Sequence, residues 1–300
     1  MILPQPGEDF HWTEVRARPA LVCDALEPVA CHAFSTRRWP LGVASPEDDT
    51  GWRAVAEAMD VDQDRLLRVR QVHEAGIVVH RAGRSIVQDV AADIVVTDDS
   101  SVALAVQTAD CVPVLIADLR TGAVAAAHAG WRGLALRVPA AAVAALIDQL
   151  GSRPSRLVAA IGPSIGSCCY EVGDDVRGRF RAAGFSEAEL HRWFLAEPLQ
   201  SAANPSLPHL SKGARAGRWF LDLWAATRDG LMAAGVPGDQ VFTARLCTAS
   251  HVDAFCSYRR DGVAAGRMAT AIRKLAGFDP SLRWRADRRA NSDRVGRART

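Results

Sequence analysis

Residues 94–128 constrain the fold of this chain more than any other stretch, because four apolar runs follow one another there with short connections. Val, Ile, Leu and Ala predominate in the runs, which occupy 94–97, 102–107, 112–117 and 123–127. Apolar runs of this length that do not alternate with polar residues are typical of strands buried on both faces. The pattern therefore predicts four successive strands in one antiparallel or mixed buried sheet.

Two side chains that can bind a metal lie at the ends of the last two runs. Cys111 directly precedes the third run and His128 directly follows the fourth. Thr121 and Gly122 lie between the two runs, and a glycine there permits the tight turn of a β-hairpin. We therefore expect Cys111 and His128 to be neighbours in space.

Strand and helix patterns continue along the remaining chain. Short apolar segments predict further strands at 30–34, 66–69, 76–80 and 157–161. Apolar spacing and helix-forming composition predict helices at 49–59, 139–150, 172–183 and 222–233. Asp222 is the expected N-cap of the last helix. The first 30 residues are expected to be irregular, because they contain no comparable pattern.

Composition places the chain among soluble globular proteins. Hydrophobic residues make up 49% and charged residues 23% of its 300 residues, and no apolar run reaches the roughly 18 residues that span a bilayer. The N-terminus has no positive segment followed by an apolar core, so a secretory signal is not expected. Seven cysteines, an odd number spread over a large core, favour reduced thiols. These features predict a cytoplasmic protein that binds no membrane.

The C-terminal segment differs in composition from the rest. Residues 283–299 hold seven arginines against two aspartates, whereas the formal net charge of the whole chain is only +2. A basic segment can bind nucleic acid, but a solvated, disordered terminus is more common, and we expect no nucleic-acid partner. The sequence therefore predicts a catalytic domain at 1–278 and a basic disordered tail at 279–300.

His73, Cys111 and His128 together offer the donor atoms of a catalytic zinc site. Zinc binds thiolate and imidazole, and a site with three protein ligands leaves a fourth position for water, which becomes a source of hydroxide near neutral pH. The wide spacing leaves two other interpretations open. The three can be buried structural residues, or Cys111 can be a nucleophile with His128 as its base. Only the zinc site requires His73.

Seven short motifs occur in a fixed order along the chain. They are QVH at 71–73, TADCVPV at 108–114, HAGWRG at 128–133, GPSIG at 162–166, CT at 247–248, SYRRD at 257–261 and GRMA at 266–269. In this order they resemble the motifs of the laccase-domain family, often called YfiH-like. Its members are variously named polyphenol oxidase, purine nucleoside phosphorylase and peptidoglycan editing factor.

The resemblance implies a fold, a metal and an activity. It implies a single α/β (α+β) domain of packed mixed β-sheets covered by helices on their outer faces, with His73, Cys111 and His128 as ligands of Zn²⁺. It implies a purine nucleoside phosphorylase with adenosine deaminase and methylthioadenosine phosphorylase activity. The expected partners are a purine nucleoside and phosphate, and a monomer is favoured over an oligomer.

Residues around the ligands are candidates for catalysis and substrate binding. Asp110, beside Cys111, is the candidate for proton transfer, with Glu74 as a second choice. Trp131 can stack on a purine or cap the core. Guanidinium groups suit a phosphate clamp, and the candidates are Arg132, Arg259, Arg260 and Arg267. An ion pair between Arg259 and Asp261 is the structural alternative.

One segment departs from the family pattern. Phe34-Ser35-Thr36-Arg37 is usually followed by a Gly-Gly pair and a Ser-containing loop, whereas here Arg38, Trp39 and Pro40 follow. Arg37 is included among the candidate substrate-binding residues, on a wall of the site that this shortened loop changes.

Three other functions stay open. A copper polyphenol oxidase needs closely paired histidines for its copper cluster, and the eight histidines contain no His-x-His pair, so copper is disfavoured. A hydrolase or amidase that uses Cys111 to edit a peptidoglycan precursor would survive chelation. A non-enzymatic binding protein would require a structural zinc closed by a fourth ligand such as Cys247.

Overall fold

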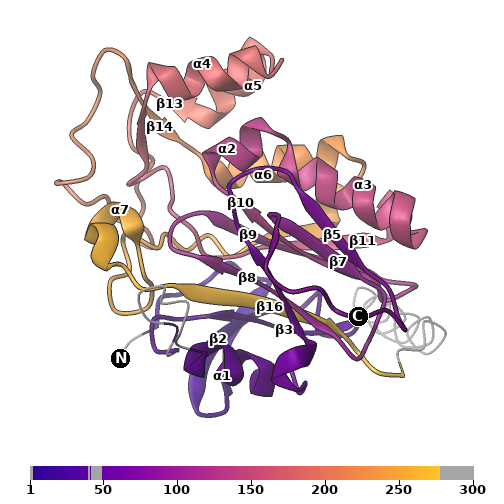
Figure 1. Cartoon of the computed structure of the whole chain (residues 1–300). Coiled ribbons are helices and arrows are strands. Elements are labelled where there is room, and N and C mark those ends of the chain that lie inside the picture. Colours follow the sequence, from indigo (N-terminus) through magenta and orange to yellow (C-terminus); the bar gives the residue numbers. More distant parts are fainter. Residues whose placement is uncertain (1–2, 40, 42–48, 278–300) are drawn as a thin grey trace, which may run out of the picture.

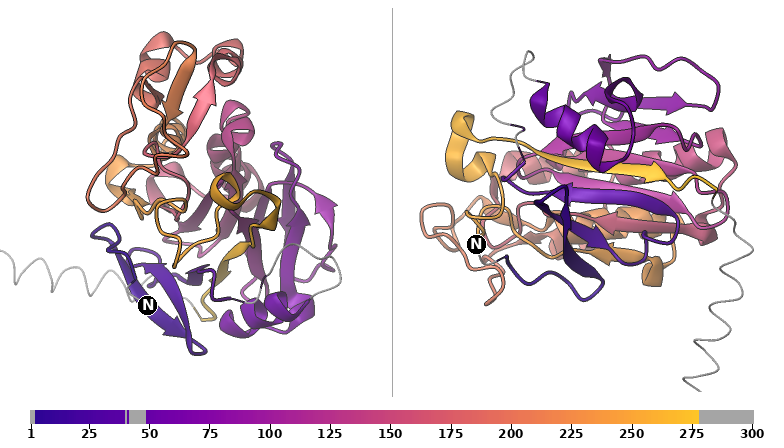
Figure 2. Two further views of the ribbon diagram at one scale, coloured as in Figure 1. Left: turned by 90° about the vertical axis from the view of Figure 1, so that its left-hand side faces the viewer. Right: turned by 90° about the horizontal axis from the view of Figure 1, so that it is seen from below.

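Two β-sheets pack face to face, and helices cover both outer faces of the pair (Figures 1 and 2). The computed structural model describes residues 3–39, 41 and 49–277 of the chain. Within these residues the chain forms one mixed α/β domain with three sheets and seven α-helices. The predicted fold class is thereby confirmed.

Seven strands from both ends of the chain form the first sheet. In spatial order they are β1 (Phe10–Val15), β2 (Arg18–Cys23), β3 (Ala30–Ser35), β16 (Met268–Lys274), β8 (Ala103–Thr108), β4 (Leu66–Arg70) and β6 (Val90–Ala91). Helix α1 (Thr50–Ala58) covers the outer face, where Val55 and Met59 pack in one cluster with Ala33, Ala105 and Ala271. These small residues on the sheet let the helix approach closely.

Six strands form the second sheet. In spatial order they are β15 (Val241–Thr243), β11 (Leu157–Ile161), β9 (Val112–Asp118), β10 (Val124–Ala129), β7 (Ile94–Thr97) and β5 (Ile77–His80). Helices α3 (Val138–Leu150) and α6 (Leu223–Ala233) cover its outer face (Figure 1). Along β9, Val114 and Ile116 join the cluster beneath these helices, whereas Leu115 and Ala117 join the cluster between the sheets. Because both faces are covered, these strands show no polar alternation.

A small third sheet and two helices form one end of the molecule (Figure 1). The strands, in spatial order, are β12 (Glu171–Gly173), β14 (Arg218–Leu221) and β13 (Phe194–Leu195), and the helices are α4 (Asp174–Ala182) and α5 (Glu187–Trp193). A capping box starts α5: the Ser186 hydroxyl accepts a hydrogen bond from the N–H of Glu189, and the Glu189 carboxylate accepts one from the N–H of Ser186. Both donors at the helix start are thereby satisfied.

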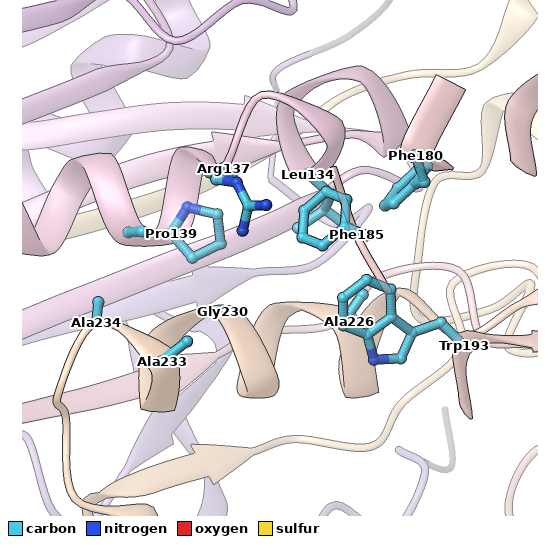
Figure 3. A pocket seen from close by; sticks show the side chains of 11 residues that line it. Leu134, Arg137, Pro139, Phe180, Phe185, Trp193, Ala226, Gly230, Ala233 and Ala234 are labelled. Atoms are coloured by element: carbon cyan, nitrogen blue, oxygen red, sulfur yellow. The ribbon is translucent and has the colours of Figure 1, made fainter. Parts of the chain in front are cut away.

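A small apolar pocket lies where this end meets α3, α6 and the short helix α2 (Trp131–Ala135). Figure 3 shows the rings of Phe180, Phe185 and Trp193 on one side of it, and Pro139 with the end of α6 on the other. The pocket has a volume of about 150 Å³. Arg137 also lines it, with its guanidinium 4.0 Å from the centre of the Phe185 ring. None of the residues predicted to bind metal or substrate lines this pocket.

The hairpin predicted between the third and fourth apolar runs is present. Strands β9 and β10 pair antiparallel, with Pro113 opposite His128. Gly122 in the connection has a φ of 70°, a left-handed conformation that favours glycine. Helices α1, α3 and α6 lie where predicted, and Asp222 caps α6 by accepting a hydrogen bond from the N–H of Ala225 (3.0 Å).

Two predictions about strands are wrong. Strand β8 does not pair with β7 or β9 but lies in the first sheet, between β16 and β4. The apolar sequence of β8 predicts that the strand is buried on both faces, but it does not predict which strands pair with it. The first 30 residues are not irregular, because β1 and β2 form a hairpin. Its turn residues, Arg16 (φ 50°) and Ala17 (φ 59°), adopt left-handed conformations without the usual glycine, so no turn signal marks it.

Three further expectations concern the termini and the helices. No helix among the described residues is long and apolar enough to cross a membrane. The predicted tail at 279–300 lies outside the described residues, as does Pro40. Helix α4 begins at Asp174, two residues later than predicted, because the chain first forms β12.

Candidate metal centre

His73, Cys111 and His128 converge beside the open end of the β9–β10 hairpin. One ring nitrogen of each histidine and the sulfur of Cys111 lie within 4.8 Å of one another. The two imidazole rings have centroids 4.9 Å apart and meet edge to face at 81°. The predicted convergence of the three residues is confirmed.

One ligand and the residue before another ligand have strained backbone conformations. His73 itself has a φ of 61° and Asp110 a φ of 91°, in the region that residues other than glycine rarely adopt. Such conformations persist only where surrounding contacts hold them, and they are concentrated at functional sites. One of these contacts is made by Gln71, whose side-chain amide donates to the carbonyl of Gln107 (2.8 Å) and accepts from its N–H (2.7 Å). The loop that carries His73 is thereby tied to β8.

The Asp93 carboxylate holds both histidines in place through hydrogen bonds. Its carboxylate accepts a hydrogen bond from Nδ1 of His128 (2.7 Å) and three more from the backbone N–H groups of Val72 (3.2 Å), His73 (3.1 Å) and Glu74 (2.8 Å). The first bond occupies Nδ1 and leaves Nε2 to face Cys111 or a metal ion, as in many metal-bound histidines. The other three hold the strained loop at His73. One buried carboxylate therefore positions ligands from two separate segments.

We expect Asp93→Asn to lower the affinity for the metal about 10- to 100-fold. The amide lacks the carboxylate charge, and its NH₂ group would face N–H donors, so both the His128 ring and the 72–74 loop lose their anchor. Competition titration with a chromogenic chelator measures the affinity. Asp99→Asn is the matched control, because Asp99 is the buried carboxylate partner of a different histidine, His80 (3.2 Å). Equal affinities in wild type and Asp93→Asn would contradict this role.

Electrostatics favour a charged pair of Cys111 and His128 in the absence of metal. Burial acts to raise the pKa of Cys111, but the charge and hydrogen bonds of His128 and His73 lower it from 9.0 to about 6. Burial acts to lower the pKa of His128, but Cys111 and Asp93 raise it from 6.5 to about 9. The thiolate is the form of cysteine that binds metals and attacks substrates. Cys111 is therefore prepared for either reaction at neutral pH.

Gly130, directly after β10, leaves room for the ligands. A Cβ atom at this position would lie 2.8 Å from the sulfur of Cys111 and 3.5 Å from Cδ2 of His73. The first distance is too short for any side chain, so the backbone can pass the ligands only as glycine. This close approach explains the glycine in the HAGWRG motif.

The donor set fits a metal ion of borderline softness. One thiolate and two imidazoles suit zinc and copper alike. Among the residues that the structure describes, no fourth His, Cys, Asp or Glu joins the group. Cys247, the expected fourth ligand of a closed structural site, lies instead with Cys168 and Cys169 in a separate cluster. The group of three therefore has the ligand number of a catalytic zinc site.

Asp110 joins three motifs next to the centre. Its carboxylate accepts hydrogen bonds from the hydroxyl of Thr248 (2.6 Å) and the N–H of Arg259 (2.6 Å). Its carbonyl accepts one from the N–H of Ile165 (2.9 Å). Burial raises the pKa of the carboxyl group. The GPSIG, CT and SYRRD motifs are thus held against the TADCVPV motif that supplies Cys111.

Arg259 packs on Tyr170, a residue whose pKa responds to the charge of Cys111. The guanidinium of Arg259 is 4.7 Å from the centre of the Tyr170 ring and donates to the carbonyl of Glu171 (2.7 Å). Burial and the charge of Cys111 raise the pKa of Tyr170, while Arg259 and Arg132 act in the opposite direction. The structure therefore groups Tyr170 with the predicted residues Cys111, Arg132 and Arg259.

Arg260 is committed to contacts within the protein. Its buried guanidinium donates to both carboxylate oxygens of Asp261 (2.7 Å each) and lowers the pKa of that carboxyl. It also donates to three backbone carbonyls, at 3.0 Å each, those of Thr248, Ala249 and Phe255. The expected pair of Arg259 with Asp261 is wrong, because the neighbouring Arg260 occupies both carboxylate oxygens.

Arg37 and Arg267 belong to a second group of arginines, around Cys256. Burial raises the pKa of the Cys256 thiol, while both guanidinium groups act to lower it. Each guanidinium also donates to a backbone carbonyl. The structure thus separates the predicted substrate-binding arginines: Arg132 and Arg259 act on Tyr170, and the others act on Cys256.

Trp131 begins helix α2 and is partly buried against the core beneath the helices. The guanidinium of Arg132 lies 4.5 Å from the centre of its ring. These contacts favour the interpretation of Trp131 as a residue that caps the core.

Asp93 and Tyr170 are the two residues of the site that the sequence did not reveal. Asp93 directly precedes β7, and no short motif contains it, so its long-range partners give no local signal. Tyr170 follows the GPSIG motif by a few residues. Extending that motif to the residue after the two cysteines would have included it.

Known proteins share the sequence pattern and the fold of this chain. The family model of the multi-copper polyphenol oxidoreductase laccases matches residues 49–274, and the chain belongs to this family. A purine nucleoside phosphorylase of Deinococcus radiodurans is 38% identical over 256 residues, 80% of this chain and 88% of that protein. Adenosine deaminase RL5, from an unknown prokaryotic organism, is 35% identical over 225 residues, 73% of this chain and 78% of that protein. The crystal structure of the hypothetical protein YfiH from Bacillus licheniformis matches with a TM-score of 0.72 and 28% identity, over 89% of this chain and 99% of that one.

Proposed function

We propose that this protein is a metal-dependent enzyme that acts on purine nucleosides, by phosphorolysis and by deamination of adenosine. The convergence of His73, Cys111 and His128, with His128 fixed by Asp93, is the observation that carries the proposal. The names of two relatives, purine nucleoside phosphorylase and adenosine deaminase, support the two reactions. Methylthioadenosine is a further proposed substrate of phosphorolysis.

We propose zinc as the metal. Zinc held by three protein ligands supplies Lewis acidity and a source of hydroxide near neutral pH. Copper oxidase chemistry needs a cluster of histidine-bound copper ions in addition to a Cys-His site. In the described part of the chain, no second candidate group contains two histidines. We therefore expect no oxygen uptake with phenols.

The residues around the metal ligands are proposed to bind the nucleoside and phosphate. Arg132 and Arg259 act electrostatically on Tyr170, as Cys111 does, and a guanidinium can form paired hydrogen bonds with a phosphate. Asp110 is the proposed residue for proton transfer, because its buried carboxyl group is adjacent to Cys111 in the chain. Arg37 and Arg267 are proposed for the outer part of the substrate site.

The test is to incubate metal-quantified protein with adenosine, with and without phosphate, and to separate the products. Inosine shows deamination. Free adenine with ribose phosphate, formed only when phosphate is added, shows phosphorolysis, and methylthioadenosine is tested in the same way. Protein whose zinc occupies the site of His73, Cys111 and His128 and that converts none of these nucleosides would contradict the proposal.

A second candidate function is thiol-dependent hydrolysis of a peptidoglycan precursor. The pKa of Cys111, about 6 in the absence of metal, makes a thiolate nucleophile available at neutral pH, with His128 as its partner. Chelation separates the two functions. A metal-dependent enzyme loses its activity on chelation and regains it with Zn²⁺, whereas a thiol hydrolase keeps its activity.

A further inference from the structure

Three cysteines form a second group of potential ligands, separate from the metal centre. Cys168 and Cys169 follow the GPSIG motif, and Cys247 begins the CT motif. Their sulfur atoms lie within 4.8 Å of one another, and all three are free thiols. Their exposed fractions are 1%, 0% and 0%. We call these three residues the thiol cluster.

Polar groups around the thiol cluster point at its sulfur atoms. The N–H of Gly166 donates to the sulfur of Cys247 (3.3 Å). The hydroxyl of Ser250 lies 3.5 Å from the sulfur of Cys168 and 3.6 Å from that of Cys169. An N–H that donates to sulfur lowers the cost of a thiolate there, but burial raises the pKa of the Cys247 thiol while no cation is bound. A buried thiolate in turn requires a positive partner.

We propose that the thiol cluster is a second metal site, which binds a thiophilic d¹⁰ cation, Zn²⁺ or Cu⁺, through three thiolates. Soft sulfur ligands select these ions over Mg²⁺ and Ca²⁺. Three sulfurs bound to one zinc ion at about 2.3 Å lie about 4 Å apart, so the cluster needs only small side-chain rotations to bind. Each sulfur that binds loses its S–H proton to water. The Ser250 hydroxyl is placed to complete a four-coordinate zinc, whereas Cu⁺ needs only the sulfurs.

An ion in the thiol cluster would join segments that are distant in the chain. Cys247 pairs with Ser164 in a β-bridge, and the next residue, Thr248, donates its hydroxyl to Asp110 (2.6 Å). Binding of Cys168, Cys169 and Cys247 to one ion would fix this arrangement next to the first centre. The site is therefore structural, and it does not rest on the proposed reaction.

The irregular segment between β13 and β14 covers the thiol cluster. The carbonyl of Pro205 in this segment accepts hydrogen bonds from the hydroxyl of Ser250 (2.7 Å) and the thiol of Cys169 (3.8 Å). The segment holds no helix or strand within 196–217. Displacement of this segment gives an ion its route to the sulfurs.

The test compares the full wild-type chain with Cys168→Ser and Cys247→Ser. Reduced, metal-free protein is titrated with Zn²⁺ in one arm and, without oxygen, with Cu⁺ in the other, and bound metal is counted by mass spectrometry. In the titration with the ion that the thiol cluster binds, we expect two equivalents of metal per chain in the wild type and one in each variant. Co²⁺ should show charge-transfer absorption from the cluster thiolates in addition to that from Cys111.

Cys23→Ser is the matched control, because Cys23 is equally buried but lies outside the thiol cluster. It should keep both equivalents, and metal should raise its Tm as much as that of the wild type. Cys111→Ser serves where a cluster variant does not fold: it should lose the first site yet keep one equivalent with the absorption of several thiolates. A wild-type chain that binds one equivalent of either ion, with the absorption of a single thiolate, would overturn the proposal.

Discussion

Cys111→Ser is expected to remove the metal from the first centre and to abolish turnover of adenosine. Serine preserves the size of the side chain, but its hydroxyl stays protonated at neutral pH and supplies no thiolate charge to the ion or to His128. Residues that only position a metal ligand contribute about 10- to 100-fold to affinity, so the loss of a ligand should exceed about 100-fold. Metal content after gel filtration and product formation from adenosine measure the two effects.

Cys31→Ser is the control for this substitution. Cys31 is partly exposed like Cys111 but lies near α1, where its sulfur is 3.9 Å from the carbonyl of Ala58. This variant should keep both metal and activity. If Cys111→Ser bound as much zinc as the wild type and kept its turnover, the metal centre and the thiol nucleophile would both be refuted.

The central strands and two of the ligands could be predicted because local rules determine them. Long apolar runs require burial on both faces, and a glycine between two runs permits a hairpin. The register of that hairpin then places Cys111 and His128 at the same end, as observed. No local rule places His73, which comes from a separate loop. Residue chemistry offered it only as one of three possible zinc donors, and the resemblance to a family assigned it to the metal.

The features that sequence could not predict depend on contacts between distant residues. Asp93 is 35 positions from His128 and hydrogen-bonds to its ring. No sequence pattern near Asp93 predicts this contact. Strand β8 has the same apolar character as its neighbours in sequence, but its partners come from β16 and β4. Arg259 and Arg260, neighbours in α7 (Tyr258–Asp261), have identical chemistry, yet Arg260 bonds Asp261 and Arg259 packs on Tyr170.

Arg260→Ala is expected to destabilise the fold by about 1–3 kcal/mol, the range for leaving buried hydrogen-bond partners unsatisfied. The side chain of Arg260 is only 8% exposed. Its loss leaves three backbone carbonyls and the Asp261 carboxylate without their donor. For domains of this general size, each kcal/mol corresponds to about 2–4 °C in Tm, so thermal and urea unfolding should both detect the loss.

Arg132→Ala is the contrasting variant that separates a structural arginine from one that binds phosphate. Arg132 is exposed and contacts the ring of its neighbour Trp131, so stability should change by less than about 1 kcal/mol. A charge-assisted hydrogen bond to phosphate is worth about 1.5–3 kcal/mol. KM for phosphate should therefore rise about 10- to 100-fold.

Arg260→Lys keeps the charge of the side chain but not its planar fork, so it should restore only part of the stability lost in Arg260→Ala. Equal unfolding midpoints for wild type and Arg260→Ala would show that the Arg260 network does not stabilise the fold.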